Sequence, residues 1–220
     1  MRRLAILCSR NPDQLLVDTV RGLNELYSEF DIVVVDSNST DVSTYDEIRD
    51  DVMAVHLAKN DNYEIGAYKF AYELYPDYDV YMCIQDSFCP SIKVELDNLA
   101  DNQICCAPLY QGLHRCHYAD FYKPSSPHQY LMDLVVGSQY EQYALDHITE
   151  GFLLVQYNSF IITKGMMEQL ISCISPILPT DKNGSAFYER MFGLLFLAIA
   201  EDLEVIDVRA SFTKTLADRQ

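Results

Sequence analysis

The stretch NDNYEIGAYKFAYELYPDYDVYMCIQDSFC, residues 60–89, predicts a loop, a helix, a buried strand and an acid at the end of that strand. Small and apolar residues recur at three- and four-residue steps, on one helical face: Gly66, Ala67, Phe70, Ala71 and Leu74. Pro76 ends this helix, and the continuous apolar run Val80–Ile84 suits a strand covered on both faces. Asp86 follows that strand directly, where ligands of open α/β sheets bind. The alternative is that Asp86 only caps the next turn.

The rest of the chain alternates strand-like and helix-like segments. Apolar runs predict further strands at residues 4–8, 31–36, 52–57, 104–107, 152–163 and 204–208. Helical spacing predicts helices at residues 13–30, 91–100, 165–174 and 185–200, with a short polar helix or turn at 41–49. This order predicts a mainly parallel sheet with right-handed crossovers. Residues 109–137 are expected to form long loops that can include an irregular hairpin and a helix around Gln129–Val136.

Length and composition favour one α/β domain over residues 1–220. A chain of 220 residues with 49% hydrophobic residues can bury a large core. No apolar run reaches the roughly eighteen residues of a membrane-spanning helix. The start MRRLAILCSRNPD predicts a first strand, since no small-residue cleavage site follows its apolar run. We therefore expect a soluble protein of the cytoplasm.

The chain is acidic, with a formal net charge of −17 and no cluster of Lys or Arg. A nucleic-acid groove and an anionic membrane surface both require clustered cations, so both partners are disfavoured. One bound nucleotide remains compatible with this charge, because a metal and a few backbone amides can hold a diphosphate.

The seven cysteines form no Cys-x-x-Cys pair, which indicates reduced thiols in a reducing compartment. The cluster HRCH, His114–His117, is a weak candidate for a structural zinc site. Four tyrosines near it could stack on sugar rings or simply pack over the sheet: Tyr110, Tyr118, Tyr122 and Tyr130.

Several nucleotide- and ester-binding motifs are absent. The segment after the first strand contains no GxGxxG fingerprint, and the chain contains neither a P-loop nor a GxSxG elbow. What remains is a pair of acids at strand ends, Asp36 and Asp86. An acid in that place suits ribose recognition or divalent-metal binding.

Five segments, in order along most of the chain, form a recognisable set: IVVVDSNSTD (32–41), AKNDNYEIGAYKFAYEL (58–74), YDVYMCIQDSF (78–88), VQYNSFIITKGMMEQL (155–170) and YERMFGLLFLAIAEDLEVIDV (188–208). Together they resemble the family-2-like glycosyltransferases of the GT-A fold. The resemblance implies a single GT-A-like, Rossmann-like domain with a small antiparallel acceptor-side portion. Residues 1–107 would bind the nucleotide-sugar and residues 108–220 would form the acceptor side. The shortened pattern is also similar to sugar transferases of large DNA viruses, which would place the protein in host cytoplasm.

The resemblance implies transfer of a sugar from a nucleoside-diphosphate sugar, UDP-sugar first, to a glycan or glycoprotein hydroxyl. Asp86 would anchor a divalent metal, Mn²⁺ or Mg²⁺, under the donor diphosphate, and Asp36 would contact the nucleotide base or the ribose. The implied nucleotide-sugar pocket comprises Ser9, Arg10, Asp36, Ser37, Lys59, Gly66, Gln85 and Asp86. Glu189 is the predicted general base, and Asp181 is the second choice. Either acid could instead cap a helix or face solvent.

The chain departs from the family at two motifs. The D-x-D position reads Gln85-Asp86-Ser87, with one carboxylate, and the E-D position reads Tyr188-Glu189. These departures keep a catalytically decayed binding domain as an alternative. A sugar-nucleotide nucleotidyltransferase is a further alternative, although the segment SRNPD (9–13) lacks the glycine-rich basic loop which that class needs.

Overall fold

The computed structural model describes residues 1–111, 136–137, 141–142 and 152–214. In this part of the chain, seven strands form one sheet in the order β3-β2-β1-β4-β7-β6-β8. Their bounds are β1 Arg3–Ser9, β2 Phe30–Asp36, β3 Ala54–His56, β4 Val80–Gln85, β6 Gln103–Gln111, β7 Phe152–Thr163 and β8 Glu204–Asp207. A separate two-stranded sheet pairs β5 Phe88–Pro90 with β9 Phe212–Lys214.

The sheet is mainly parallel, as predicted. Strands β3, β2, β1 and β4 run parallel to one another. Strand β7 is antiparallel to both β4 and β6, and β8 is parallel to β6. The predicted α/β class with an antiparallel portion is therefore confirmed. Because one sheet contains strands from residues 1–107 and 108–220, the two predicted halves share a core.

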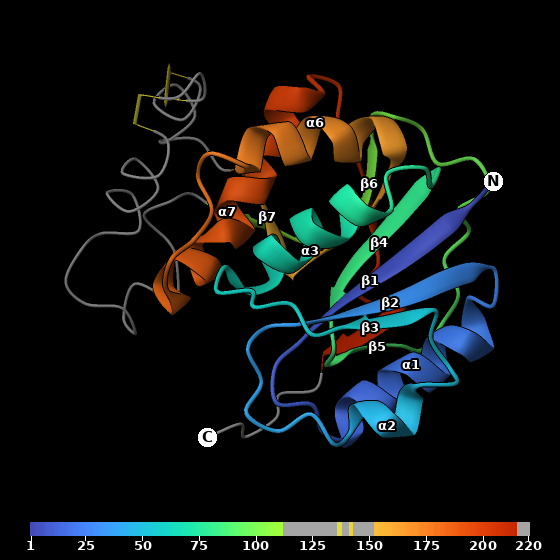
Figure 1. The fold of residues 1–220 in the computed structure, drawn as a ribbon. Helices are drawn as coiled ribbons and strands as arrows, with labels where there is room; N and C mark the ends of the chain where they lie inside the picture. Colours follow the sequence, from blue (N-terminus) through green and yellow to red (C-terminus); the bar gives the residue numbers. More distant parts are fainter. Residues whose placement is uncertain (112–135, 138–140, 143–151, 215–220) are drawn as a thin grey trace.

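Helices cover both faces of the sheet (Figure 1). Helices α1 Gln14–Leu26 and α2 Tyr45–Ile48 lie below it in that view, and α3 Tyr63–Leu74, α6 Lys164–Ile174 and α7 Lys182–Ile199 lie above it. Alternate residues of each strand point to opposite faces, which produces two cores. In β1, Leu4, Ile6 and Cys8 belong to the core under α3, α6 and α7, and Ala5 and Leu7 belong to the core over α1.

The small sheet closes the α1 side. Strand β5 lies against α1, and its partner β9 brings in residues from far along the chain. The Phe212 ring stacks on Tyr27 of the α1 end and on Phe88 of β5, at centroid distances of 6.0 Å and 5.0 Å. Phe212 is 4% exposed, so β9 is a packed strand of the core.

The predicted strands and most predicted helices are present within a few residues of their expected bounds, but the predicted helix over residues 91–100 is wrong. This segment forms turns and irregular chain instead. Its amides bond to distant groups: Ser91 N donates to Ser211 O at 2.8 Å, and Val94 N donates to the Tyr27 hydroxyl at 2.9 Å. These long-range bonds replace the local ladder of a helix.

Some predictions fall outside the described residues. These are the helix around Gln129–Val136, the zinc candidate His114–His117, and the tyrosines Tyr118, Tyr122 and Tyr130. Tyr110 lies in β6.

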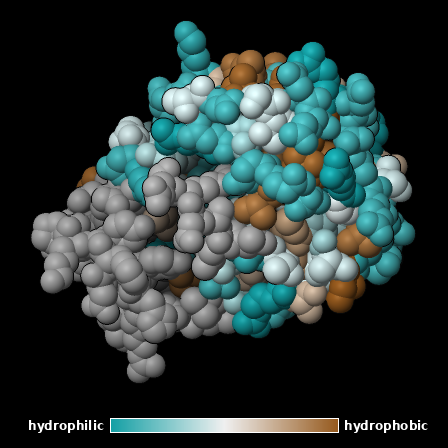
Figure 2. Space-filling model, turned by 90° about the horizontal axis from the view of Figure 1, so that it is seen from below, coloured by the Kyte–Doolittle hydropathy of each residue, from teal (hydrophilic) through white to brown (hydrophobic). Residues whose placement is uncertain are grey.

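The described part of the surface is mainly hydrophilic on one face of the molecule (Figure 2). On the face seen in Figure 2, hydrophilic residues predominate and hydrophobic ones are scattered among them. None of the helices in the described ranges is both long enough and apolar enough to cross a membrane. Six cysteines in these ranges are free thiols, and burial raises the pKa of the Cys8 and Cys83 thiols well above the usual range.

Candidate functional site

The carboxyl ends of three neighbouring strands, β2, β1 and β4, bring together Asp36, Ser9 and Asp86. Asp36 is the register partner of Ser9, and Asp86 N donates to Cys8 O, so the ends of these strands lie level. The Ser9 hydroxyl donates to Asp86 Oδ2 at 2.7 Å. Both acids are 4% exposed and Ser9 is 1% exposed. The two acids therefore occupy one edge of the sheet, on either side of Ser9.

Asp36 is held by donors of the loop that follows β2. Its carboxylate accepts from Ser39 N at 3.1 Å, from the Ser39 hydroxyl, and from the Tyr45 hydroxyl at 2.6 Å. Burial first, and then the Asp36 carboxylate, raise the pKa of Tyr45 well above the usual range, while a hydrogen bond to Ser9 opposes them. Tyr45 thus connects Asp36 to Ser9 and, through Ser9, to Asp86.

Gln85 links the strand end to a buried acid that the sequence analysis missed. Gln85 Nε2 donates to Glu64 Oε1 at 3.1 Å. Glu64, 8% exposed in the first turn of α3, also accepts from Asn158 Nδ2 at 2.6 Å and from the Ser185 hydroxyl at 3.0 Å. This carboxylate therefore joins α3, β4, β7 and α7 at the same edge. A single glutamate in the first turn of a helix is usually solvent-exposed, so the sequence gives no sign that Glu64 is buried.

Lys214 is the second residue that the sequence analysis missed. From the end of β9, its ammonium donates to Gln85 Oε1 and, at 2.6 Å, to the Ser87 hydroxyl. It also lies over the Tyr157 ring, 5.4 Å from the centroid. The two acceptors flank Asp86 in the chain, so the ammonium places a positive charge at the carboxyl end of β4.

Glu189 of α7 lies at this edge as well. It is 8% exposed, and its Oε1 accepts from Tyr157 N at 2.7 Å. Burial is the main cause that raises the pKa of Glu189 to about 7; the Glu64 charge acts in the same direction, and the Tyr157 N–H and Lys214 oppose it. A carboxyl group with this pKa can exchange a proton near neutral pH.

Backbone strain in β7 accompanies these contacts. Tyr157 and Asn158 have φ values of 60° and 49°, which residues other than glycine rarely adopt. The strained pair presents Tyr157 N to Glu189 and the Asn158 amide to Glu64. Such strain is concentrated at functional sites in proteins generally.

Asp181, the second predicted base, caps a helix. It is the N-cap of α7, and its Oδ1 accepts from Gly184 N at 2.7 Å. An N-cap carboxylate that satisfies a free amide has a structural role in its own right.

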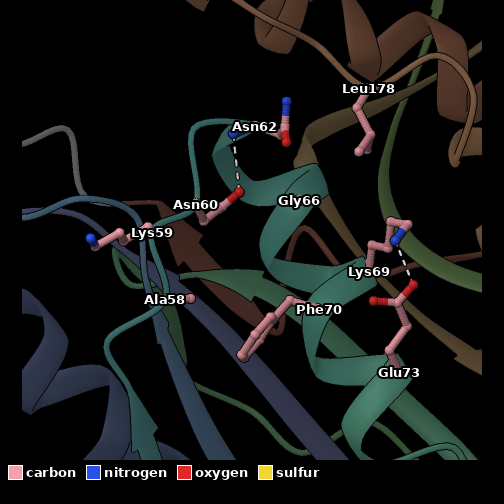
Figure 3. Close-up of a pocket in the computed structure, with 9 residues that line it drawn as sticks. All are labelled: Ala58, Lys59, Asn60, Asn62, Gly66, Lys69, Phe70, Glu73 and Leu178. Carbon is pink, nitrogen blue, oxygen red and sulfur yellow. Dashed lines mark hydrogen bonds and ion pairs between the residues drawn. The ribbon is translucent and has the colours of Figure 1, made fainter.

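The other predicted pocket residues divide between two places. Ser37, 6% exposed, follows Asp36 and accepts from Asn60 Nδ2 at 2.8 Å, and Arg10 is exposed after Ser9. Lys59 and Gly66 line a separate pocket of about 260 Å³ beside α3 (Figure 3), together with Ala58, Asn60, Asn62, Lys69, Phe70, Glu73 and Leu178. Figure 3 shows the Lys59 amine pointing away from the rest of this lining.

The glycine at position 66 is explained by packing. A Cβ on Gly66 would lie 2.2 Å from Asn60 Oδ1, so a larger residue would push out the turn that precedes α3. The Asn60 side chain holds that turn by accepting from Asn62 N at 3.0 Å.

The donors around Asp86 fit a divalent metal poorly. Within the described ranges, no group of three His, Cys, Asp or Glu residues is arranged to hold a metal ion. The side-chain oxygens of Gln85 and Ser87, which flank Asp86, accept from the Lys214 ammonium. The ammonium would repel a divalent cation bound here, and Asp86 would be the only carboxylate of the segment 85–87 to bind it.

The solved structures to which this chain is similar include two glycosyltransferases. One is a mannosyltransferase from Pyrobaculum calidifontis in complex with GDP-Man and Mn²⁺ (TM-score 0.45, 11% identity, 94% of this chain and 57% of that chain). The other is the apo form of the glycosyltransferase GlyE from Streptococcus pneumoniae TIGR4 (TM-score 0.44, 11% identity, 96% of this chain and 46% of that chain). Both are glycosyltransferases.

The chain spans about half the length of these two proteins. No protein-family profile and no curated protein sequence matches it.

Proposed function

We propose that this protein is a glycosyltransferase that moves a sugar from a nucleoside-diphosphate sugar to the hydroxyl of a glycan or glycoprotein. A UDP-sugar is the first choice of donor. The observation that carries the proposal is the meeting of Asp36, Ser9 and Asp86 with Glu189 and Lys214 at one edge of the sheet. Ligands of open α/β sheets bind at this edge. The motif resemblance in the sequence supports the same reaction.

The strand ends are the proposed donor side. Asp36 and Asp86 are anchored by hydroxyl groups, so their positions are fixed before a ligand arrives. Such fixed polar groups orient a bound nucleotide without reorganisation. Residues 1–107 supply these groups, and Glu189 from residues 108–220 faces the acceptor in this proposal. The predicted divalent metal is assigned no step here, because the donors around Asp86 do not fit one.

Glu189 is the proposed general base. A carboxyl group with a pKa of about 7 is ionised in about half of the molecules at neutral pH and can accept a proton from an attacking hydroxyl. Turnover then rises as the pH increases through about 7. Asp181 is the weaker candidate, since its carboxylate caps α7.

Two substitutions test the base, with donor turnover as the readout. Glu189→Gln keeps the acceptor of the Tyr157 amide and removes the proton acceptor, so we expect turnover to fall by about 10²- to 10⁴-fold with donor binding nearly unchanged. Asp181→Asn keeps an N-cap and serves as the matched control, with near-normal turnover expected. Loss of turnover in Asp181→Asn alone would transfer the role to Asp181.

A non-catalytic nucleotide-binding domain is the second candidate. The observation in its favour is that Asp36 accepts three hydrogen bonds from the protein itself, which is what a purely structural acid does. Thermal unfolding with UDP, GDP and CMP tests whether the protein binds a nucleotide at all, because a ligand that binds the native state raises the unfolding temperature. Both candidate functions require such binding. Stabilisation by a nucleotide without any turnover of its sugar conjugates supports the binding domain.

A further inference from the structure

We propose that Lys214 is the cation that neutralises the donor diphosphate, and that transfer therefore proceeds without a divalent metal. This inference rests on the proposed function and changes its cofactor. It is carried by the contacts of the Lys214 ammonium with Gln85 and Ser87, the two neighbours of Asp86.

The location of the charge is the first argument. Strand β4 delivers Gln85, Asp86 and Ser87 to the edge where the three strand ends meet. The Lys214 ammonium is bound to the side-chain oxygens before and after Asp86, so it lies where the diphosphate of a bound donor would need a positive charge. The side chain is half-buried, and partial burial strengthens its interaction with a phosphate oxygen relative to that of a fully solvated lysine.

The rigidity of β9 is the second argument. Backbone pairing places Lys214 opposite Phe88 and Phe212 opposite Pro90. The Phe212 ring is held between Tyr27 and Phe88, two residues before Lys214. The Tyr157 ring faces the ammonium from β7 at 5.4 Å, an arrangement that favours a cation at this point. The lysine is thus positioned by two sheets, as a residue with a defined role would be.

The mismatch with a metal is the third argument. A divalent ion beside Asp86 needs further oxygen donors, and in the described part of the chain the nearest candidates in sequence, the side-chain oxygens of Gln85 and Ser87, already accept from an ammonium. The chain also carries a formal net charge of −17, so the dianionic diphosphate of the donor, which gains a further negative charge as it leaves, is repelled unless a local cation offsets that field. Lys214 supplies one.

The transfer step balances with these residues. The acceptor oxygen forms a bond to the anomeric carbon, and the bond between that carbon and the diphosphate oxygen breaks. The electron pair of the broken bond stays on the diphosphate, beside the Lys214 ammonium. The proton of the acceptor hydroxyl goes to the Glu189 carboxylate and is then released to water.

The experiment measures binding of UDP and GDP by calorimetry, in EDTA and in Mn²⁺, for the wild-type protein and for Lys214→Met. Lys164→Met is the matched control: Lys164 forms an ion pair with Asp77, before β4 begins, and its loss changes the net charge by the same unit. We expect the wild type and Lys164→Met to bind one of the diphosphates in EDTA, and Lys214→Met to bind it at least tenfold more weakly. Circular dichroism checks that each variant is folded.

The outcomes separate this inference from the proposed function. If the wild type binds only with Mn²⁺, or if Lys214→Met binds as tightly as the wild type in EDTA, the role of Lys214 is wrong. Neither result contradicts the proposed glycosyltransferase function. Absence of binding by the wild type under both conditions rejects the proposed function itself. If Lys214→Met does not fold, the wild-type protein in EDTA decides alone: it should bind UDP or GDP at least tenfold more tightly than uridine or guanosine, and equal affinities contradict the proposal.

Discussion

At the scale of one residue, the ionised form of Glu189 lowers the stability of the folded protein. Its pKa is about 7 in the folded protein against an ordinary value of 4.5, so folding disfavours its ionised form. The stabilising contribution is complete below pH 4.5 and is lost as the pH rises to about 7. Burial is the main cause of the raised pKa. Above pH 7 the ionised carboxylate destabilises the fold by on the order of 3 kcal/mol.

The pH dependence of unfolding tests this directly. Between pH 5 and pH 8, we expect the free energy of unfolding of the wild type to fall by about 2 kcal/mol more than that of Glu189→Gln, whose amide does not ionise. Urea denaturation of both proteins at the two pH values gives the difference, in which all other titrating groups cancel. Parallel pH curves would mean that Glu189 ionises in the folded protein as it does in water.

The residues of the site differ in how far the sequence could reveal them. Asp36 and Asp86 each follow a buried apolar run, so their position at strand ends could be read from the pattern. Glu64 and Lys214 carry no such pattern. Their roles depend on which distant residues the fold brings to them, over 94 positions for the Glu64–Asn158 bond and 129 for the Lys214–Gln85 bond. A single sequence contains no local signal for contacts of that range.

At the scale of elements, the contact between α7 and β7 depends on one glycine. A Cβ on Gly193 would lie 1.6 Å from the carbonyl oxygen of Leu153, a backbone atom that cannot rotate away. Helix α7 can therefore lie close against β7 only with glycine at this point. The same contact holds Glu189, one turn earlier, over the strained residues Tyr157 and Asn158.

Gly193→Ala should destabilise the protein by about 3 kcal/mol or more, because the helix must move off the strand. Chemical denaturation measures this loss. Gly165→Ala in α6 is the matched control, since its Cβ would meet only the Asp101 carboxylate, at 3.3 Å, and we expect a change within about 1 kcal/mol. Equal stabilities of the two variants would show that α7 shifts without cost.

The predicted helix over residues 91–100 is wrong because contacts with other elements determine the conformation of this segment. Its local spacing is compatible with a helix, but Val94 and Leu96 pack into the core over α1, and the amides of Ser91 and Val94 bond to residues far away in the chain. Tertiary contacts outweigh local propensity in such segments. Strands β1, β2 and β4 were predictable because their burial on both faces leaves continuous apolar runs, whereas the short strands β5 and β9 were not predicted.

For the whole molecule, the formal net charge of −17 is the dominant electrostatic feature. The ion pairs in the described residues are mostly exposed, and each such pair contributes little. Self-repulsion among the acids therefore exceeds local attraction, and screening should stabilise the folded state.

Raising NaCl from about 0.1 M to 1 M shortens the screening length from about 10 Å to about 3 Å, so we expect the unfolding temperature to rise by about 2–4 °C for each kcal/mol of repulsion relieved. Calorimetry at pH 7 measures the rise. The same series near the isoelectric point, pI ≈ 4.4, is the control, where the effect should shrink. A fall in unfolding temperature with salt at pH 7 would show that ion pairs dominate.

The packing of β9 against β5 has a consequence for biosynthesis. The ribosome delivers the strands in chain order, so β1, β2 and β4 can emerge and collapse long before Phe212 and Lys214 are translated. A nascent or prematurely terminated polypeptide then contains Asp36 and Asp86 without the ammonium beside them. Any product that ends before Lys214 lacks this charge, so under the proposed function it would bind a sugar donor more weakly.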